Sequence, residues 1–526
     1  MSELDTRLID ALSLGARASL NSPHHGAHHG AHHGAHHGAH HGAHKGAPSR
    51  PALHPSLSPQ APSTPHEADG ALLIERACEA AEQLGALGNP KAVGPLVRAL
   101  STPHAPLREA ICDALGALAD LRATNPLLSA LRDPDEDVRA SAFSALLQIG
   151  QQRSSAMPDA DAWGRHFADP TAALTQIAWQ TDVEAIKLLE AALEDANAEV
   201  KIGAIYTLSH LGIQGALPRV TSLATQDPDE DVRAAATYGL GELALRGAPQ
   251  AATQVMQTLT GLWQQPQNDE VRGAILRAVG ELEHPAGAGL CYSALSSAEP
   301  RCDEVTRQAA VIALGRLRDP RALPTLSEAL RDPHKGVRRN AAFAIGFLLT
   351  PPQGRWADEL SVAQRALTPQ QLHAEVARAL VFGAAGQDGE VRAALGASLK
   401  RVERMSALTA IAEALRGGDE LTRAGAAHLL SVHPDELGLR EALRDPSPEV
   451  RKRAALASGS AQLSTLRPDL EARLDDEAWE VRVGAAEGLK RLGDPQAAPA
   501  LAAHQGDPHP IVRNAIEVSL KALSSS

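Results

Sequence analysis

Histidine is the residue whose number and spacing most suggest chemistry in this chain. The unit HHGA occurs five times between residues 24 and 43, and thirteen of the 23 histidines lie at or before His66. Neutral imidazole suits Zn, Ni and Cu, so adjacent pairs at every fourth residue can capture a metal ion. The predicted metal ligands are His24, His25, His28, His29, His32, His33, His36, His37, His40, His41 and His44.

Two other interpretations of the histidine segment stay open. It can be a low-complexity expansion without a selected role, or a segment that becomes cationic in mild acid, because histidine titrates near pH ~6.5. Beyond Zn or Ni on this segment, the sequence predicts no cofactor.

The rest of the chain predicts no catalytic residue. It contains no GxGxxG after a strand, no GxxxxGK[ST] and no HExxH, and its acidic residues cluster where helices begin. The four cysteines are scattered without a CxxC pair, so we expect buried free thiols rather than a zinc site, although Cys291 and Cys302 can meet across a repeat. We therefore expect a protein that is not an enzyme.

Composition limits the class of protein. Aromatic residues are only 2% of the 526 residues while hydrophobic residues are 44%, which favours thin layers of helices over a large globular core. The net charge of -13 repels phosphate backbones, so nucleic acid is not an expected partner. No apolar run is long enough to span a membrane, and the first residues lack the pattern of a secretory signal, so we expect a cytoplasmic protein.

A short motif repeats along the chain and predicts the elements that carry it. DPDEDVR occurs at 133–139 and again at 227–233, and variants follow at 332–338, 445–451, 476–482 and 507–513. Weaker copies occur at 102–108 and 195–201, and residues 268–272 and 303–307 keep only the later half. Several motif arginines lie 31 residues apart, for example at 108 and 139 and at 451 and 482.

The motif predicts the start of a helix. Its Asp is expected to cap backbone N–H groups, and its Pro suits the first helical position. Val138, Ala142, Ala145 and Ile149 then form one apolar stripe, whose small residues allow close packing. A proline 13 to 15 residues before several motif arginines opens a preceding helix, so each unit is a helical pair that must stack on its neighbours.

This unit resembles the HEAT repeat, in the short form of phycobilisome lyases. The resemblance rests on Asp-Pro, Val-Arg, Ala-Ala and a later Gly, as in DPDEDVRAAATYGLGEL at 227–243, and covers roughly 75–526. It implies an all-α, right-handed α-solenoid of about 12 repeats. It also implies an Asp–Arg ladder between neighbouring repeats, in which Asp133/Arg139, Asp227/Arg233, Asp332/Arg338, Asp445/Arg451 and Asp507/Arg513 are structural.

The predicted organisation follows from where the repeat is clear. Residues 1–21 can form an amphipathic helix, 22–66 a disordered His- and Pro-rich linker, and 67–150 the N-terminal repeats. Central repeats occupy 151–372, with insertions at 151–170 and 350–372, and C-terminal repeats occupy 373–526. Each insertion holds one of the five tryptophans, Trp163 and Trp356, which are candidate protein-binding residues, although the insertions can equally be hinges or degenerate repeats.

The favoured function is a non-enzymatic scaffold or adaptor that binds one or more proteins along the concave face of the solenoid. The resemblance also leaves open a bilin lyase-like role in chromophore handling. It does not favour the HEAT enzyme deoxyhypusine hydroxylase, which binds iron through several His-Glu dipeptides, because this chain has one, at residues 66–67. Metal binding by the histidine segment is the third hypothesis.

Overall fold

A computed structural model describes residues 3–17, 65–154, 183–296, 302–352, 355–364 and 367–524. Every regular element in these ranges is a helix, and twelve helical pairs run from α3/α4 to α26/α27. The predicted all-α, right-handed solenoid of about 12 repeats is confirmed. The predicted metal ligands between His24 and His44, and Trp163, lie outside the described residues. No helix in the described ranges has both the length and the apolar character needed to cross a membrane.

The chain forms two compact units, Met1–Thr207 and Leu208–Ser526. Helix α1 packs against α2 in unit 1: Leu12 is fully buried, and a Cβ at Gly15 would lie 2.1 Å from Ala77 Cβ. The boundary between the units falls within α8. The helices up to this boundary are α1 (Glu3–Ala16), α2 (Pro65–Ala86), α3 (Val93–Ala99), α4 (Ala105–Leu118), α5 (Thr124–Ala130), α6 (Glu136–Ser154), α7 (Val183–Ala192) and α8 (Ala198–Leu211).

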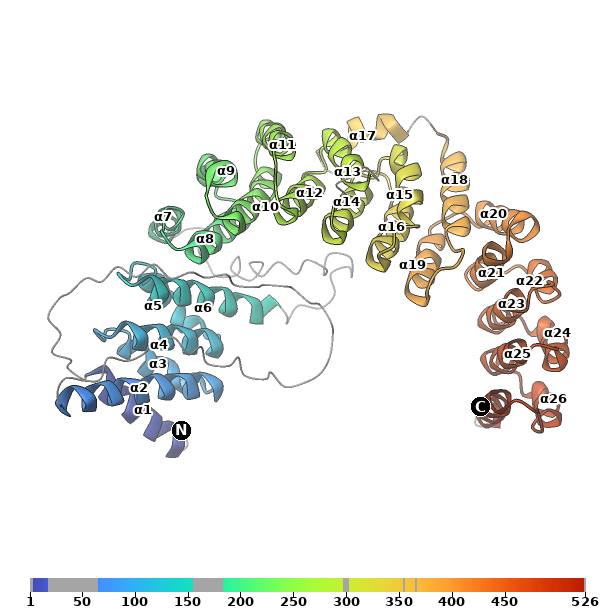
Figure 1. The fold of residues 1–526 in the computed structure, drawn as a ribbon, viewed down its shortest axis with the longest axis horizontal. Helices are drawn as coiled ribbons and strands as arrows, with labels where there is room; N and C mark the ends of the chain where they lie inside the picture. The colour runs from blue at the N-terminus through green and yellow to red at the C-terminus, as the bar shows by residue number, and fades with distance from the viewer. Residues whose placement is uncertain are drawn as a thin grey trace. The chain divides into compact units, whose positions relative to one another are not determined.

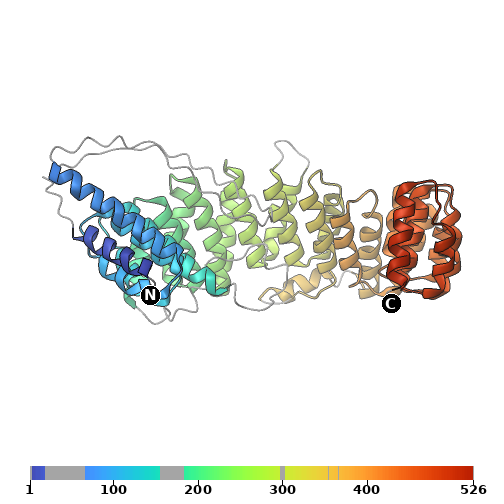
Figure 2. The same ribbon diagram turned by 90° about the horizontal axis from the view of Figure 1, so that it is seen from below.

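Unit 2 is a row of helical pairs in two layers. Figure 1 shows the second helix of each pair in one layer, from α10 through α14 and α19 to α25, and the first helices in the other; Figure 2 shows the row from below. The helices are α9 (Leu217–Gln226), α10 (Glu230–Arg246), α11 (Pro249–Trp263), α12 (Asp269–Leu282), α13 (Ala288–Leu295), α14 (Glu304–Leu317), α15 (Leu323–Ala329), α16 (Lys335–Phe347), α17 (Ala357–Gln364), α18 (Pro369–Phe382), α19 (Gly389–Leu399), α20 (Arg404–Gly417), α21 (Glu420–Leu429), α22 (Glu436–Ala442), α23 (Pro448–Ser460), α24 (Arg467–Ala472), α25 (Trp479–Leu492), α26 (Ala498–Ala503) and α27 (Pro510–Ser524).

The start of the second helix differs from the predicted one. Helix α10 begins at Glu230, and its N-cap is Asp229, whose carboxylate accepts from the N–H groups of Asp231 and Val232. The motif residue Asp227 lies two positions earlier, and its carboxylate accepts from Asp229 N. The prediction that the Asp of Asp-Pro caps the helix was wrong. Asp227 accepts a hydrogen bond within the turn that precedes the helix, and Asp229 is the N-cap.

Neighbouring second helices approach closely because glycine lies where they cross. A Cβ added to Gly116 of α4 would lie 2.7 Å from Ala145 Cα of α6, and one added to Gly459 of α23 would lie 2.2 Å from Gly488 O of α25. Small residues therefore set the spacing of the layer, as the sequence predicted. Within unit 2 the second helices lie in one layer, with one side turned away from the first helices.

Candidate protein-interaction surface

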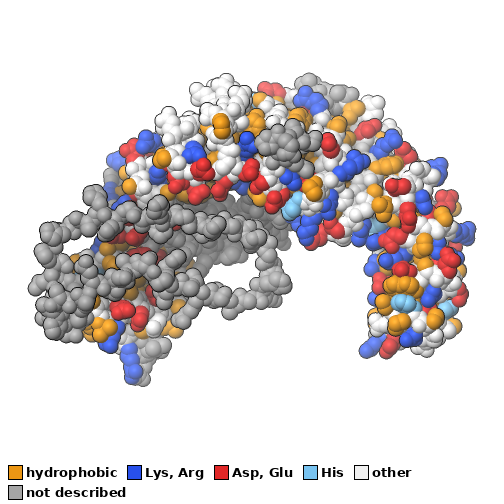
Figure 3. All heavy atoms as spheres, in the orientation of Figure 1, with side chains coloured by type: hydrophobic (Ala, Val, Ile, Leu, Met, Phe, Trp, Pro, Cys, Tyr) orange, Lys and Arg blue, Asp and Glu red, His pale blue; other side chains and the backbone are white. Residues whose placement is uncertain are grey.

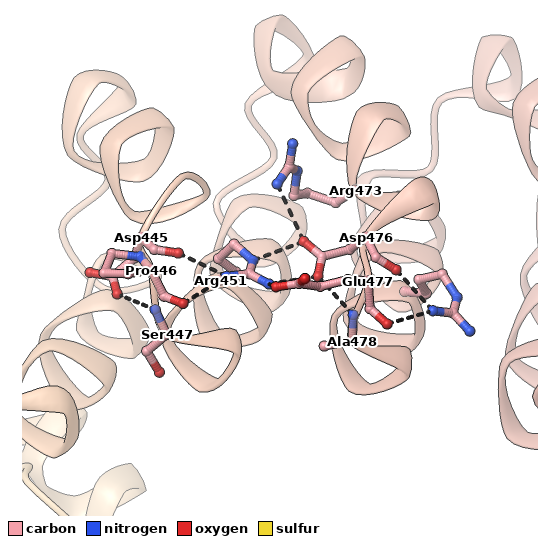
Figure 4. Close-up of polar contacts among 9 residues, drawn as sticks. Asp445, Pro446, Ser447, Arg451, Arg473, Asp476, Glu477 and Ala478 are labelled. Atoms are coloured by element: carbon pink, nitrogen blue, oxygen red, sulfur yellow. Dashed lines mark hydrogen bonds and ion pairs between the residues drawn. The ribbon is translucent and has the colours of Figure 1, made fainter.

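A ladder of buried ion pairs joins successive second helices, as Figure 4 shows for α23 and α25. Arg451 Nε and Nη2 donate to Asp476 Oδ2 and Oδ1 at 2.8 and 2.7 Å, while Nη1 donates to the carbonyl oxygen of Asp445 at 3.0 Å. The side chains of Arg451 and Asp476 are 7% and 2% exposed. Each arginine therefore fixes the turn of its own repeat and holds the carboxylate of the next.

The same rung recurs in both units. The pairs with both Nε and Nη2 donating to one carboxylate are Arg108–Asp133, Arg139–Asp195, Arg307–Asp332, Arg423–Asp445, Arg451–Asp476 and Arg482–Asp507. Hydrogen bonds from Arg482 hold the pKa of Asp507 below its ordinary value, despite burial. The expected ladder is confirmed for Asp133, Arg139, Asp332, Asp445, Arg451 and Asp507, whose charged groups are occupied by a bidentate pair. It is not confirmed for Arg233 and Arg513, whose guanidinium groups donate to carbonyls of their own turn.

Four arginines of unit 2, Arg233, Arg272, Arg338 and Arg392, have no such bidentate pair with the next repeat, whose turn is one residue shorter. In such a turn the motif arginine reaches the carbonyl five residues back, as Arg423 does to Gly418 O at 3.1 Å. Arg233 contacts Asp227 O, Pro228 O and Glu230 in its own repeat. In the next repeat, the residue at the position of the ladder Asp is Cys302 for Arg272 and Gln387 for Arg338. Arg272 Nη1 lies 3.9 Å from Cys302 Sγ. Arg338 Nε donates to Gln387 Oε1 at 3.0 Å. For Arg392 the equivalent residue is Gly418, which has no side chain.

The free side of the second helices carries one row of residues. In α10 the residues that follow Arg233 by three, four and seven positions are fully buried: Ala236, Thr237 and Leu240. At 3.6 residues per turn, the fifth residue points to the opposite side. The half-buried residues at this position are Tyr238, Arg277, Ile312, Phe343, His428, Leu456 and Glu487.

We call these seven residues the inner row. It mixes aromatic, aliphatic and charged side chains, and Figure 3 shows acidic and basic groups interspersed over the visible face of unit 2. Interfaces between proteins are built from such mixtures of apolar and polar contacts, with aromatic and Arg residues enriched. The inner row is therefore suited to protein contacts spread over many repeats.

The predicted candidate Trp356 lies at an edge of unit 2, apart from the inner row. Its ring centroid lies 4.3 Å from that of His284, and it helps line a cleft of about 400 Å³ with Glu281, Glu283, Arg316 and Arg318. The preceding Arg355 donates through Nη1 to Ala244 O at 3.2 Å and through Nη2 to Gly247 O at 2.5 Å.

This part of the 350–372 insertion therefore ties the end of α10 to a segment more than 100 residues away. Arginine hydrogen bonds to the last carbonyls of a helix satisfy groups that lack intrahelical partners. Trp356 Nε1 is buried with no hydrogen-bond partner among the described residues. The insertion then forms α17 and continues into α18.

The described residues offer little for catalysis. No group of three or more His, Cys, Asp or Glu in them is placed to hold a metal ion. All four cysteines are free, as predicted, and burial raises the pKa of Cys112 and of Cys291 to about 12. A thiol with so high a pKa is a poor nucleophile at neutral pH.

Comparison with known proteins identifies the repeat. The family model for HEAT repeats matches residues 75–147, 183–280, 256–346 and 436–521, more than half of the chain. No curated protein matches the chain. Among solved structures, human deoxyhypusine hydroxylase is 19% identical with a TM-score of 0.22, and covers 61% of this chain and 99% of its own.

Two larger solved structures are also similar. Kap121p bound to Pho4p is 14% identical with a TM-score of 0.43 and covers 86% of this chain and 52% of its own. Importin beta is 14% identical with a TM-score of 0.42 and covers 86% of this chain and 65% of its own. At these TM-scores the likenesses carry no functional inference.

Proposed function

Because the chain belongs to the HEAT-repeat family, we propose that it is a non-enzymatic scaffold or adaptor that binds another protein along the inner row of unit 2. The observation that carries this proposal is the row itself, seven half-buried side chains on α10, α12, α14, α16, α21, α23 and α25; in α19 the residue at this position, Ala397, is exposed. Ion pairs join some of these repeats, as Arg307–Asp332 and Arg451–Asp476 do. A stable interface of about 1,600 Å² needs an extended surface, which consecutive repeats supply.

Crosslinking in native lysate tests the proposal when combined with matched substitutions. A double substitution on the inner row, Ile312→Glu and Leu456→Glu, places two charges where the proposal expects apolar contact. The control places the same charges on first helices, at Met405→Glu and Leu437→Glu, where the side chains are 67% and 70% exposed. We expect the inner-row variant to lose its reproducible crosslinked partner and the control to keep it.

Either of two results would contradict the scaffold. One is a chain recovered as a monomer without a reproducible crosslink. The other is a set of crosslinks confined to the first helices and lost only in the control variant. Circular dichroism of both variants would confirm that the helices remain.

The finer resemblance, to the repeats of phycobilisome lyases, supports a second candidate function: a bilin lyase-like role in chromophore handling. The supporting observation is the short period with Val-Arg and a later Gly, as in residues 227–243. Fold-level analogy carries little functional weight, so a direct assay is needed. Adding a linear tetrapyrrole should shift its absorbance if this role holds; an unchanged spectrum excludes it.

We also propose that the histidine segment captures Zn or Ni, as its paired imidazoles suggest. Calorimetric titration would compare the full chain with one in which the eleven histidines from His24 to His44 are replaced by Asn. Substitution is preferable to truncation because α1, before the segment, packs against α2. Equal metal stoichiometry in both chains would exclude the proposal.

A further inference from the structure

Arg392 is a ladder arginine without a side-chain acceptor in the part of the chain that the structure describes. Its Nη1 donates to the carbonyl oxygen of Gln387, in the turn of its own repeat. The position that should supply a carboxylate is Gly418. A Cβ there would lie 2.5 Å from Ala414 O and 2.7 Å from Thr422 Cγ2, so the turn has no room for a side chain. The other donors of Arg392 therefore lack the partner that the neighbouring rungs supply.

A cleft of about 240 Å³ opens at Arg392, and we call it the Arg392 cleft. It lies among the turn after α18 and helices α19, α21 and α23. Its lining residues are Ala384, Gly386, Gln387, Arg392, Leu421, Ala424, Gly425, Glu449 and Arg453. Leu421 is 54% exposed, so the rim is apolar, while two guanidinium groups lie in the wall. The volume suits one side chain of a partner.

Two guanidinium groups and one carboxylate lie in the wall of the cleft. Glu449 is the acid of the cleft wall, and its Oε1 lies 2.7 Å from Arg453 Nε while its Oε2 lies 3.5 Å from Lys452 Nζ. Burial and the charges of Arg392 and Arg453, with that of Arg491, lower the pKa of the adjacent His428 to about 4. His428 is thus neutral at pH 7. The carboxylates of Asp388 and Glu449 act on Arg392 electrostatically, but neither forms an ion pair with it.

We propose that the Arg392 cleft binds an Asp or Glu side chain from an acidic segment of the partner protein. The incoming carboxylate would complete the rung that Gly418 leaves open, with the fork geometry of the adjacent rungs, where Arg423 holds Asp445 at 2.8 and 3.0 Å. The planar guanidinium matches a carboxylate bidentately. The net charge of -13 disfavours a nucleic acid as the source of the anion.

The inference rests on the proposed scaffold function and names one class of contact within it. The probe is a fluorescein-labelled twelve-residue peptide of alternating Glu and Leu, with its Gln and Leu counterpart as the neutral probe. Arg392→Gln should weaken binding of the acidic peptide by about tenfold or more, since hydrogen bonds to charged groups are among the strongest. Arg453→Gln should weaken it by a smaller factor.

Arg416→Gln is the matched control. It removes the same charge from α20, where Arg416 is exposed and its Nε donates to Ala412 O. We expect wild-type affinity from this variant. As a second readout, saturating acidic peptide should raise the pKa of His428 from about 4, because a carboxylate would enter its surroundings.

The proposal is overturned if the neutral peptide binds as tightly as the acidic one, if Arg416→Gln weakens binding as much as Arg392→Gln, or if an RNA of the same length binds more tightly. Failure here is distinguishable from failure of the scaffold. If the native partner still crosslinks to the inner row and is lost in the Ile312→Glu and Leu456→Glu variant, the scaffold stands without the acidic contact.

Discussion

Removing one partner of the most buried rung should destabilise the two repeats that it joins. In Asp476→Ala, Arg451 would keep its bonds to the carbonyls of Asp445 and Pro446 but lose its buried counter-charge. Breaking a buried ion pair typically costs about 3–5 kcal/mol. Because Glu477, 85% exposed, remains 3.5 Å from Arg451 Nη2, we expect the lower end, about 3 kcal/mol.

Local opening is the appropriate measurement, because repeat arrays do not unfold as a single two-state unit. Hydrogen exchange followed by mass spectrometry reports the free energy of opening of α23 and α25 separately from the other helices. A loss of about 3 kcal/mol accelerates amide exchange by roughly 100-fold, at 1.4 kcal/mol per factor of ten. Helices of unit 1 should exchange at their original rates.

The control is an ion pair of the same charge type at the surface. Arg378 and Glu413 lie 2.8 Å apart but are 60% and 47% exposed, so Glu413→Ala should cost about 0–1 kcal/mol. Replacing both members of the buried rung, Arg451→Met with Asp476→Leu, should recover most of the lost stability, since paired apolar side chains leave no buried charge. Acceleration below about fivefold in Asp476→Ala, equal to that in Glu413→Ala, would refute the reasoning.

Three further predictions follow from packing, titration and capping. A methyl group in Gly459→Ala would lie 2.2 Å from Gly488 O, so the melting temperature should fall by the equivalent of about 1–3 kcal/mol, whereas Gly417→Ala, with nothing within 4 Å, should not lower it. Burial and nearby arginines lower the pKa of His428 to about 4 in the folded chain, so the stability that depends on its neutral form is fully present above pH ~6.5 and is lost as the pH falls toward 4. His428→Gln should therefore flatten the pH dependence of stability in this window. NMR of Arg453→Gln should show a higher pKa for His428. Arg355→Ala removes the hydrogen bonds that attach this segment to the end of α10, so chymotrypsin should cleave after Trp356 several-fold faster. Arg331→Ala, a substitution at an exposed arginine, should leave the cleavage rate unchanged.

The fold could be predicted from the sequence because the same repeat motif occurs many times along the chain. The same spacing of Asp, Val and Arg recurs, and each copy carries the helix start, the buried stripe and the ladder residues. It did not predict which Asp caps the helix. In the sequence, Asp227 and Asp229 are both suitable N-cap residues. The structure shows that Asp227 accepts a hydrogen bond in the preceding turn and that Asp229 caps the helix.

The Arg392 cleft was missed because its residues come from separate repeats and none is unusual alone. Arg453 follows Arg392 by 61 positions, and each stands in an ordinary helix. One signal was present: at 417–419 the sequence reads Gly-Gly-Asp where strong repeats have an Asp-Pro turn. The pattern alone cannot show that this change removes a counter-ion, because the arginine affected belongs to the preceding repeat.

Among the altered rungs, those of Arg338, Arg272 and Arg392 differ in how far the arginine is compensated. Gln387 offers Arg338 a neutral amide oxygen, and Asp388 Oδ2 accepts from the same guanidinium at 2.9 Å. Cys302 offers Arg272 a sulfur, which is a weak acceptor. Gly418 offers Arg392 nothing, and there a cleft opens in which Arg453 adds a second guanidinium. An unpaired charge in a packed wall is costly unless a counter-ion arrives, so a partner's carboxylate would gain from entering the cleft at Arg392.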